Sequence, residues 1–255
     1  MNVMSTSKWF VSPKTNRQAG FRLFCFPYAG GSASIYRLWG ERTANLEVCA
    51  VELPGRGLRL SEQLYTGMEP LTEAMLKAIE PMLDKPFAFF GHSMGALIAF
   101  EVARLLKRTC LRQPTQLFLS GHGAPHIRSD KKPVHLLEEK EFVERLKTLN
   151  GTPLEVLQNE ELMEFVGPII RADFAITETY SFRAGEVLDC PITVFNGVHD
   201  ADVSFYDLAQ WRSYTYGAFQ TSLFPGDHFY LHGHYDKLCR LIEQQLLVQC
   251  LEPVS

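Results

Sequence analysis

The stretch that decides the fold is "FAFFGHSMGALIAFEVARLLKR", residues 87–108. Its first four residues are apolar or aromatic and predict a buried strand, and the segment from Ala96 onward predicts a long amphipathic helix. Between them lies Gly-His-Ser-Met-Gly, which fits the G-x-S-x-G pattern of a sharp strand-to-helix turn that exposes a serine, Ser93. Gly and Ser are also common in ordinary turns, but the strand before and the helix after favour the reactive turn.

The alternation of strand and helix continues along the chain and predicts an α/β fold with a mostly parallel central sheet flanked by helices. The chain has 255 residues and 46% hydrophobic content, enough for one core, so we predict a single domain over residues 1–255. Strands are predicted at 21–27, 47–53, 87–91, 116–121, 191–197 and 220–226. Helices are predicted at 34–44, 70–83, 94–107, 205–214 and 235–248.

Residues 128–187 interrupt this alternation. They contain no good strand, but two charged, amphipathic segments, "LLEEKEFVERLKTL" and "NEELMEFVGPIIRADFAITETY", predict helices. Because the insertion follows the fourth predicted strand, it would lie over the carboxyl ends of the strands, where open α/β sheets bind ligands. We therefore predict a helical lid.

Composition excludes several classes of function. The formal net charge of −4 and pI near 6.1 argue against a nucleic-acid-binding protein. The apolar runs are far shorter than the roughly 20 residues that cross a bilayer. Residues 1–20 are polar, lack the features of a secretory signal and are interpreted as a loose lead-in. The six cysteines form no CxxC pair, which favours reduced thiols, so we expect a cytoplasmic protein. Nothing in the sequence demands more than a monomer, which is the oligomeric state we expect.

A serine hydroxyl attacks poorly until a base takes its proton, so Ser93 needs a histidine and an orienting acid. The segment "FNGVHDADV" follows one predicted strand and offers Asp200 and Asp202. Asp200 is favoured because it lies in the loop itself, whereas Asp202 is predicted to be the N-cap of the next helix. Both acids would lie near Ser93, because parallel strands end at one edge of the sheet.

The histidine comes from "FPGDHFYLHGH", which follows the last predicted strand. His228 is favoured because it comes directly after the turn, whereas His232 and His234 are predicted to lie on the surface. These three histidines also suggest a metal site, but no second ligand motif is visible, so no metal is predicted. Of the other histidines, His92 is expected to pack in the turn, His199 to face solvent, and His122 and His126 to line the cleft without a catalytic role.

An oxyanion needs two preorganised N–H donors. One is predicted to be the amide of Met94, directly after the serine. The other is predicted to come from the glycine-containing loop "PYAGGSA", residues 27–33, through Ala29 or Tyr28. This loop matches neither the G-x-G-x-x-G nor the P-loop pattern, so a nucleotide site is not favoured.

Several motifs together resemble the type II thioesterases of polyketide and nonribosomal peptide synthetases: "FCFPYAGGSASIY", "VELPGRGLR", "FFGHSMGALIAFEVAR", "FLSGHGAP", "IIRADFAITETY", "CPITVFNGVHDADVS" and "FPGDHFYL". The resemblance covers residues 21–247. It implies an α/β-hydrolase fold and hydrolysis of acyl groups from the phosphopantetheine arm of carrier domains. It also implies a triad of Ser93, Asp200 and His228, oxyanion donors at Ala29 and Met94, and a lid at 128–187, with no metal or bound cofactor.

Three alternatives stay open at this point. A chain-terminating fatty acid synthase thioesterase shares these motifs. A general carboxylesterase is less favoured, because its oxyanion loop usually reads HGGG and this one reads PYAGG. A non-catalytic module with the same fold is disfavoured because all three triad residues are present. Docking to an acidic carrier surface would use basic residues near the cleft, for which we suggest Arg128, Lys131 and Lys132.

Overall fold

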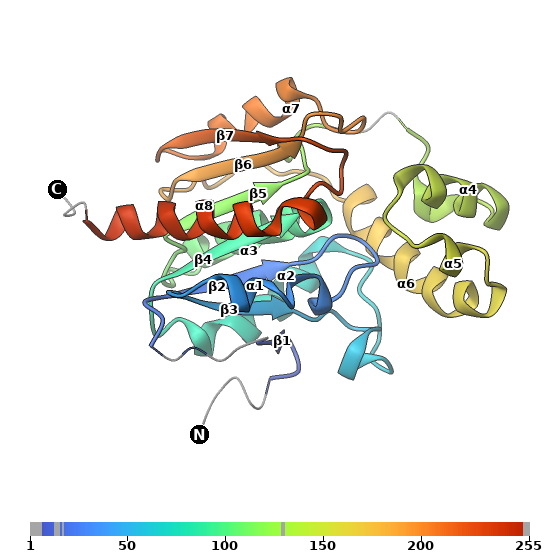
Figure 1. Cartoon of the computed structure of the whole chain (residues 1–255), viewed down its shortest axis with the longest axis horizontal. Helices are drawn as coiled ribbons and strands as arrows, with labels where there is room; N and C mark the ends of the chain where they lie inside the picture. The colour runs from blue at the N-terminus through green and yellow to red at the C-terminus, as the bar shows by residue number, and fades with distance from the viewer. Residues whose placement is uncertain (1–6, 13–15, 17, 129–130, 252–255) are drawn as a thin grey trace.

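The computed structural model describes residues 7–12, 16, 18–128 and 131–251. Seven strands form one sheet in the order β1-β3-β2-β4-β5-β6-β7 (Figure 1). β1 runs antiparallel to β3, and all the other neighbouring strands pair in parallel. The strands are β1 Phe10–Val11, β2 Phe21–Phe26, β3 Leu46–Val51, β4 Phe87–His92, β5 Gln116–Ser120, β6 Ile192–Gly197 and β7 Phe219–Phe224. This is the α/β-hydrolase arrangement predicted from the sequence.

The five central strands, β2 to β6, are buried along their whole length. A parallel strand covered on both faces needs a continuous apolar run, which is why these segments show little alternation in sequence. β7 lies at the edge and is half-buried. The six predicted strands were correct, and their ends differ from the observed ones by at most two residues.

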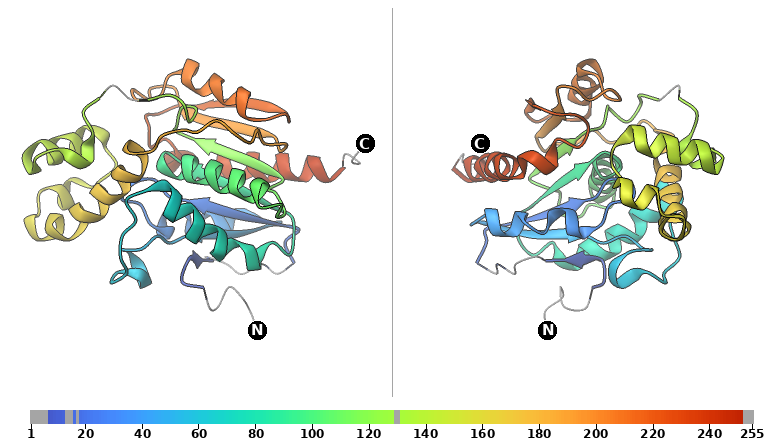
Figure 2. Two further views of the ribbon diagram at one scale, coloured as in Figure 1. Left: turned by 180° about the vertical axis from the view of Figure 1, so that it is seen from behind. Right: turned by 45° about the vertical axis from the view of Figure 1, so that its right-hand side comes forward.

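Helices cover both faces of this sheet (Figure 2). α2 and α3 pack on one face, where Phe89 and Leu97 belong to one core. α1 and α8 pack on the other face, where Phe90 and Leu238 belong to a second core. The helices outside the predicted lid are α1 Trp39–Arg42, α2 Met68–Ile79, α3 Met94–Arg108, α7 Phe205–Ala209 and α8 Leu231–Leu251.

Two predicted helices were wrong in form. Residues 34–44 fold as a 3₁₀ helix, Ala33–Tyr36, followed by the short α1, because burial of Tyr36 and Trp39 takes precedence over regular helix. The Tyr36 hydroxyl donates to the carbonyl of Phe26 at 2.6 Å, which fixes this turn against β2. Residues 205–214 likewise divide into α7 and a 3₁₀ helix, Gln210–Tyr214, whose Trp211 is fully buried.

The interpretation of residues 1–20 as a loose lead-in was wrong for residues 9–11. Phe10 is buried and pairs with Val51, so β1 extends the sheet. The Arg59 guanidinium lies 3.6 Å from the centre of the Trp9 ring, a cation–π contact that fastens this segment. Residues 1–6, 13–15 and 17 lie outside the described part of the chain.

Between β5 and β6 the chain forms a group of helices beside the sheet (Figures 1 and 2). A small core that includes Phe142, Leu146 and Met163 holds them together. The group comprises a 3₁₀ helix Val134–Leu136, α4 Glu139–Leu149, α5 Leu154–Leu157 and α6 Glu160–Glu178, all within residues 128–187. Over residues 7–12, 16, 18–128 and 131–251, the structure contains no helix with the length and apolar character of a membrane span.

Candidate active site

Ser93 lies at the turn between β4 and α3, with φ 54° and ψ −119°. A positive φ costs a non-glycine residue about 1–3 kcal/mol, and it persists only where the surroundings impose it. Here the Ser93 N–H donates to the carbonyl of Ser120 on the neighbouring strand β5, at 2.7 Å. The sequence therefore folds locally as its G-x-S-x-G pattern predicts, with the serine on a strained turn at the carboxyl end of a strand.

The two glycines of the motif let α3 pack directly on the sheet. A Cβ at Gly91 would lie 2.1 Å from the Gly95 carbonyl oxygen, and a Cβ at Gly95 would lie 2.2 Å from the Phe26 carbonyl oxygen. Both contacts are with backbone, which cannot swing away as a flexible side chain can. The glycines therefore set the helix position that places Ser93.

We expect Gly95→Ala to lower the free energy of unfolding by about 1–3 kcal/mol or more, because the new methyl group overpacks a backbone contact. Urea denaturation followed by circular dichroism measures this loss. Gly20→Ala is the matched control, since a Cβ at Gly20 has no atom within 4 Å. Equal stability of the two variants would contradict the close-packing argument.

Asp200 and His228 form a direct pair. The Asp200 Oδ2 atom lies 2.7 Å from His228 Nδ1, with the carboxylate fully buried and the imidazole 16% exposed. The other carboxylate oxygen accepts the backbone N–H groups of Asp202 at 2.9 Å and Val203 at 3.2 Å. These contacts fix the acid on one side of the ring, so Nδ1 faces Asp200 and Nε2 is the nitrogen left to act as a base.

The prediction that Asp202 caps the following helix was wrong. Ser204 is the N-cap of α7 and forms a reciprocal capping box with Asp207. Asp202 instead forms ion pairs with Lys131 and Arg145, of which the second measures 3.5 Å. Partial burial opposes ionisation, but these cations outweigh it and lower the pKa of Asp202. Asp202 thus joins the loop after β6 to the inserted helices and does not contact His228 through a hydrogen bond.

His92 lies behind His228, with 5.0 Å between the centres of the two rings. Gly121 makes room for both, since a Cβ there would lie 2.6 Å from one ring and 3.2 Å from the other. His92 Nδ1 lies 2.7 Å from the Ser120 hydroxyl, which lies 2.6 Å from the hydroxyl of Tyr230. Because His92 directly precedes Ser93, the contact between the rings of His92 and His228 places His228 beside the serine turn. His92 packs in the turn, as predicted.

Burial lowers the pKa of His92 well below its usual value, and the nearby His228 and His232 lower it further. The folded protein therefore binds fewer protons at this position than the unfolded chain does, so stability rises with pH in that range. We expect stability to fall progressively as the pH drops below about 6.5, the unfolded value. Thermal unfolding at pH 7.5, 6.5 and 5.5 checks this. His92→Asn should reduce the slope of the melting temperature against pH. An unchanged slope in that variant would assign the effect to other groups.

The loop after β2 forms a tight turn next to Ser93. The Gly31 N–H donates to the Tyr28 carbonyl at 2.9 Å, and Gly30 adopts φ +76°. A Cβ on Gly95, two residues after Ser93, would touch Phe26 and Pro27, so this loop begins against the start of α3. Met94 is the first residue of α3, where a backbone N–H has no acceptor within the helix. The two predicted oxyanion donors thus lie on elements packed against each other.

The other histidines occupy positions around the site. His199 and His232 are exposed, and Tyr28 OH lies 3.0 Å from His232 Nε2. His126 Nδ1 lies 2.6 Å from Tyr214 OH, and His122 Nδ1 lies 2.7 Å from the Gly123 carbonyl oxygen. Burial lowers the pKa of His122, which favours its neutral form. Among the side chains that the structure describes, no three metal-ligating residues gather into a candidate metal site.

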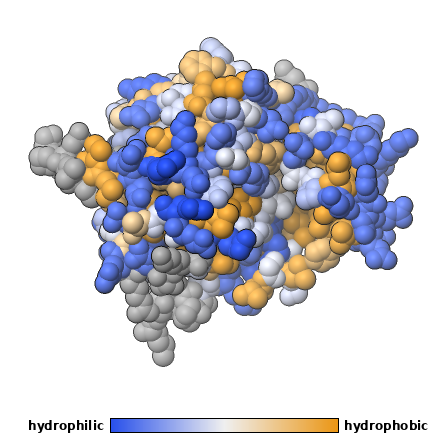
Figure 3. Space-filling view, in the orientation of Figure 1, coloured by the Kyte–Doolittle hydropathy of each residue, from blue (hydrophilic) through white to orange (hydrophobic). Residues whose placement is uncertain are grey.

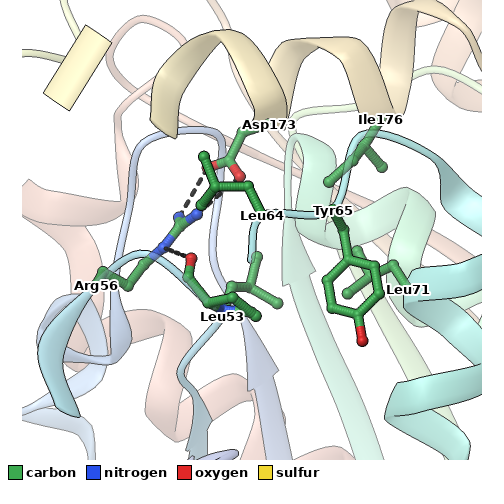
Figure 4. A pocket seen from close by; sticks show the side chains of 8 residues that line it. Leu53, Arg56, Leu64, Tyr65, Leu71, Asp173 and Ile176 are labelled. Carbon is green, nitrogen blue, oxygen red and sulfur yellow. Dashed lines mark hydrogen bonds and ion pairs between the residues drawn. The ribbon is translucent and has the colours of Figure 1, made fainter. Parts of the chain in front are cut away.

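Sequence analysis did not identify one buried ion pair beside the site. Arg56 and Asp173 form two parallel hydrogen bonds of 2.7 and 2.8 Å (Figure 4). Asp173 Oδ2 also accepts the Gly30 N–H at 2.7 Å. Both residues lie in the motifs "VELPGRGLR" and "IIRADFAITETY", but nothing in the sequence shows that these segments meet. The small pocket beside the pair is lined by neither Ser93 nor His228, so it is distinct from the candidate active site.

The basic residues suggested for docking all make contacts within the chain. Lys131 pairs with Asp202, and Lys132 lies 2.6 Å from Glu141. Arg128 donates to the Ser181 hydroxyl at 2.9 Å. Lys131 and Lys132 are more than half exposed, but each is paired with a carboxylate, so the contacts do not single them out as a docking surface.

Comparisons with known proteins show which family this chain is similar to. The family model described as "Thioesterase domain" matches residues 21–246. The gramicidin S biosynthesis protein GrsT of Aneurinibacillus migulanus is 40% identical over 245 residues, covering 96% of each chain. The solved structure of the type II thioesterase BorB from the borrelidin biosynthetic cluster is similar, with a TM-score of 0.85, 34% identity, and coverage of 93% of this chain and 97% of that one.

One relative has a name that points to different chemistry. The linear gramicidin dehydrogenase LgrE of Brevibacillus parabrevis is 41% identical over 247 residues, covering 95% of this chain and 94% of that protein. A nicotinamide-binding loop would read G-x-G-x-x-G between a strand and a helix. The loop after β2 reads PYAGGSA, and it is held as the tight turn described above. The dehydrogenase name is therefore not transferred to this chain.

Proposed function

Because this chain belongs to the thioesterase family, and is a thioesterase of the type II group found with polyketide and nonribosomal peptide synthetases, we propose that Ser93, His228 and Asp200 are its catalytic triad. The observation that carries the proposal is the pair of a fully buried Asp200 and His228 at 2.7 Å, packed against the strained serine turn. The strand directions support the proposal, because β4, β6 and β7 run parallel in one sheet and each of the three residues follows the carboxyl end of one of them.

In the first half of the proposed reaction, the Ser93 hydroxyl attacks the thioester carbonyl while His228 accepts its proton. Asp200 holds the imidazole in the required tautomer and stabilises the imidazolium that forms. The backbone N–H groups of Met94 and Ala29 donate to the oxyanion, in a site where preorganised donors act without solvent reorganisation. The intermediate then collapses, the carbon–sulfur bond breaks, and His228 protonates the departing thiolate.

In the second half, His228 removes a proton from water, which attacks the acyl-serine. The second tetrahedral intermediate uses the same two N–H donors, and its collapse returns the proton from His228 to the Ser93 oxygen. The products are a free carboxylic acid and the unmodified serine. Protein groups alone carry every proton in this scheme, so we propose no metal or bound cofactor.

The substrate we propose is an acyl group on the phosphopantetheine arm of a carrier domain, removed when it is misprimed or stalled. The insertion at residues 128–187, with its helices at residues 134–178, is proposed to act as a lid over the acyl chain. Their contacts with the loops of the triad support this, since Asn150 Nδ2 lies 3.3 Å from Asp227 Oδ2, next to His228. We propose that the enzyme works as a monomer in the cytoplasm, where the buried free thiols of Cys25, Cys49, Cys190 and Cys239 stay reduced.

The test compares hydrolysis of one short acyl group presented on a holo-carrier protein, on coenzyme A and as a simple oxygen ester. We expect kcat/KM to be highest for the carrier, by about tenfold or more over coenzyme A, because docking adds binding energy away from the reacting atoms. Equal or faster hydrolysis of the oxygen ester would assign the protein to general esterase chemistry instead. A series of acyl lengths on the same carrier then separates editing from release of long fatty acids.

A further inference from the structure

We propose that Asp173, on helix α6, and Arg56 form a positioning pair that sets the oxyanion-donor turn at residues 28–31. The inference rests on the function proposed above, since it assigns a role to residues that do not touch the reacting atoms. It also gives the inserted helices a second task besides covering the acyl chain. When α6 is in this position, the Asp173 carboxylate accepts the Gly30 N–H in the loop that is proposed to bind the oxyanion.

The pair holds the turn through the backbone of two adjacent residues, Gly30 and Gly31. Asp173 Oδ2 accepts the Gly30 N–H at 2.7 Å, and Arg56 Nη1 donates to the Gly31 carbonyl oxygen at 2.7 Å. The guanidinium and the carboxylate are held face to face by two further hydrogen bonds, and both side chains are at least nine-tenths buried. Figure 4 shows Asp173 reaching down from its helix to the Arg56 guanidinium.

The Asp173 contact selects one form of the turn. A turn closed by an N–H of the fourth residue on the carbonyl of the first has two common forms, which differ by a flip of the central peptide. The positive φ of Gly30, at the third position, is the mark of the type II form. In this form the Gly30 N–H points to Asp173. Without the carboxylate this N–H loses its acceptor, and Arg56 loses the partner that holds it against the Gly31 carbonyl.

Turn geometry matters because Ala29 shares this turn. The peptide that carries the Ala29 N–H also carries the Tyr28 carbonyl, which is fixed by the Gly31 N–H at 2.9 Å. In a trans peptide the N–H points opposite to the C=O, so holding Gly31 fixes the direction of the Ala29 donor. Arg56 holds Gly31 and Asp173 holds Gly30. A displacement of about 1 Å at an oxyanion donor is enough to cost a large factor in rate.

A buried ion pair is a poor means of raising stability, because desolvation of the two charges offsets most of their attraction. The chain contains a comparison pair of similar burial, Arg22 with Glu47 at 2.9 Å, at the amino-terminal end of the sheet. That pair joins two neighbouring strands far from the serine turn. Arg56 and Asp173 differ in that both contact the backbone of the oxyanion loop.

The experiment measures Asp173→Asn and Arg56→Lys in the full chain, with Glu47→Gln as the control for loss of a buried ion pair. Each variant is assayed for kcat and KM on the acyl-carrier substrate and for thermal stability. The affinity for a trifluoromethyl ketone, which forms a tetrahedral oxyanion on a reactive serine, is compared with the affinity for a non-hydrolysable amide analogue. The ratio of the two affinities reports the oxyanion site and not general folding.

We expect Asp173→Asn to lower kcat by about tenfold or more, to weaken ketone binding by a similar factor, and to change KM and amide binding by less than about threefold. Arg56→Lys keeps the charge but loses the planar fork, and should shift the same ratio less. Glu47→Gln should lower only the melting temperature.

A wild-type affinity ratio in Asp173→Asn would overturn the proposal, as would a loss confined to the melting temperature. If Asp173→Asn does not fold, the ratio in Arg56→Lys decides. Failure of the proposed function has a separate signature, because wild-type protein would then bind the ketone no better than the amide.

Discussion

Ser93→Ala is expected to lower kcat by about 10⁴-fold or more while the protein stays folded. Removal of the nucleophile disables the triad as a unit, and only binding and the oxyanion donors are left to assist water. Ser93 is partly exposed at the sheet edge, and its backbone N–H to Ser120 does not depend on the hydroxyl. We therefore expect the melting temperature to change by only a few degrees.

The measurement is single-turnover hydrolysis of an acyl-carrier substrate, with circular dichroism to confirm the fold. Mass spectrometry of the wild-type protein, quenched during turnover of a slow substrate, should show an acyl adduct on the peptide that contains Ser93. Ser34→Ala provides the matched control, since it removes an exposed serine hydroxyl elsewhere in the chain. Retained turnover in Ser93→Ala would remove the basis of the mechanism.

The sheet and the serine turn were predictable because they depend on local patterns. A run of buried apolar residues, a glycine-flanked serine and a following helix are each visible within about 20 residues of sequence. Because parallel strands end at one edge of a sheet, the sequence alone was enough to predict that Asp200 and His228 lie near Ser93. In the structure β4, β6 and β7 belong to one sheet, and Asp200 and His228 lie 2.7 Å apart.

What the sequence could not predict depends on contacts between distant segments. Asp173 and Arg56 are 117 positions apart, and no periodicity or spacing connects them. The role of Asp202 was misjudged because Ser204 competes for the same N-cap position, and a full capping box decides in favour of Ser204. β1 was missed because two residues are too few to show a pattern, and pairing with β3 supplies the hydrogen bonds that form it.

Asp200→Asn is expected to lower kcat by about 10⁴-fold with little change in structure. The amide has the shape of the carboxylate, but its NH₂ group can face His228 Nδ1 only if that nitrogen accepts a hydrogen bond. The ring then carries its proton on Nε2, the nitrogen that must take the proton of Ser93. Asparagine also loses the negative charge that stabilises the imidazolium in the transition state.

Asp202→Asn is the matched comparison, because it changes the competing acid two residues away and removes only ion pairs to Lys131 and Arg145. We expect its kcat to stay within about threefold of wild type, since exposed ion pairs contribute little. Steady-state kinetics of both variants on one acyl-carrier substrate decides between the two acids. A large loss in Asp202→Asn with a small one in Asp200→Asn would reverse the assignment, even though only Asp200 lies 2.7 Å from the imidazole.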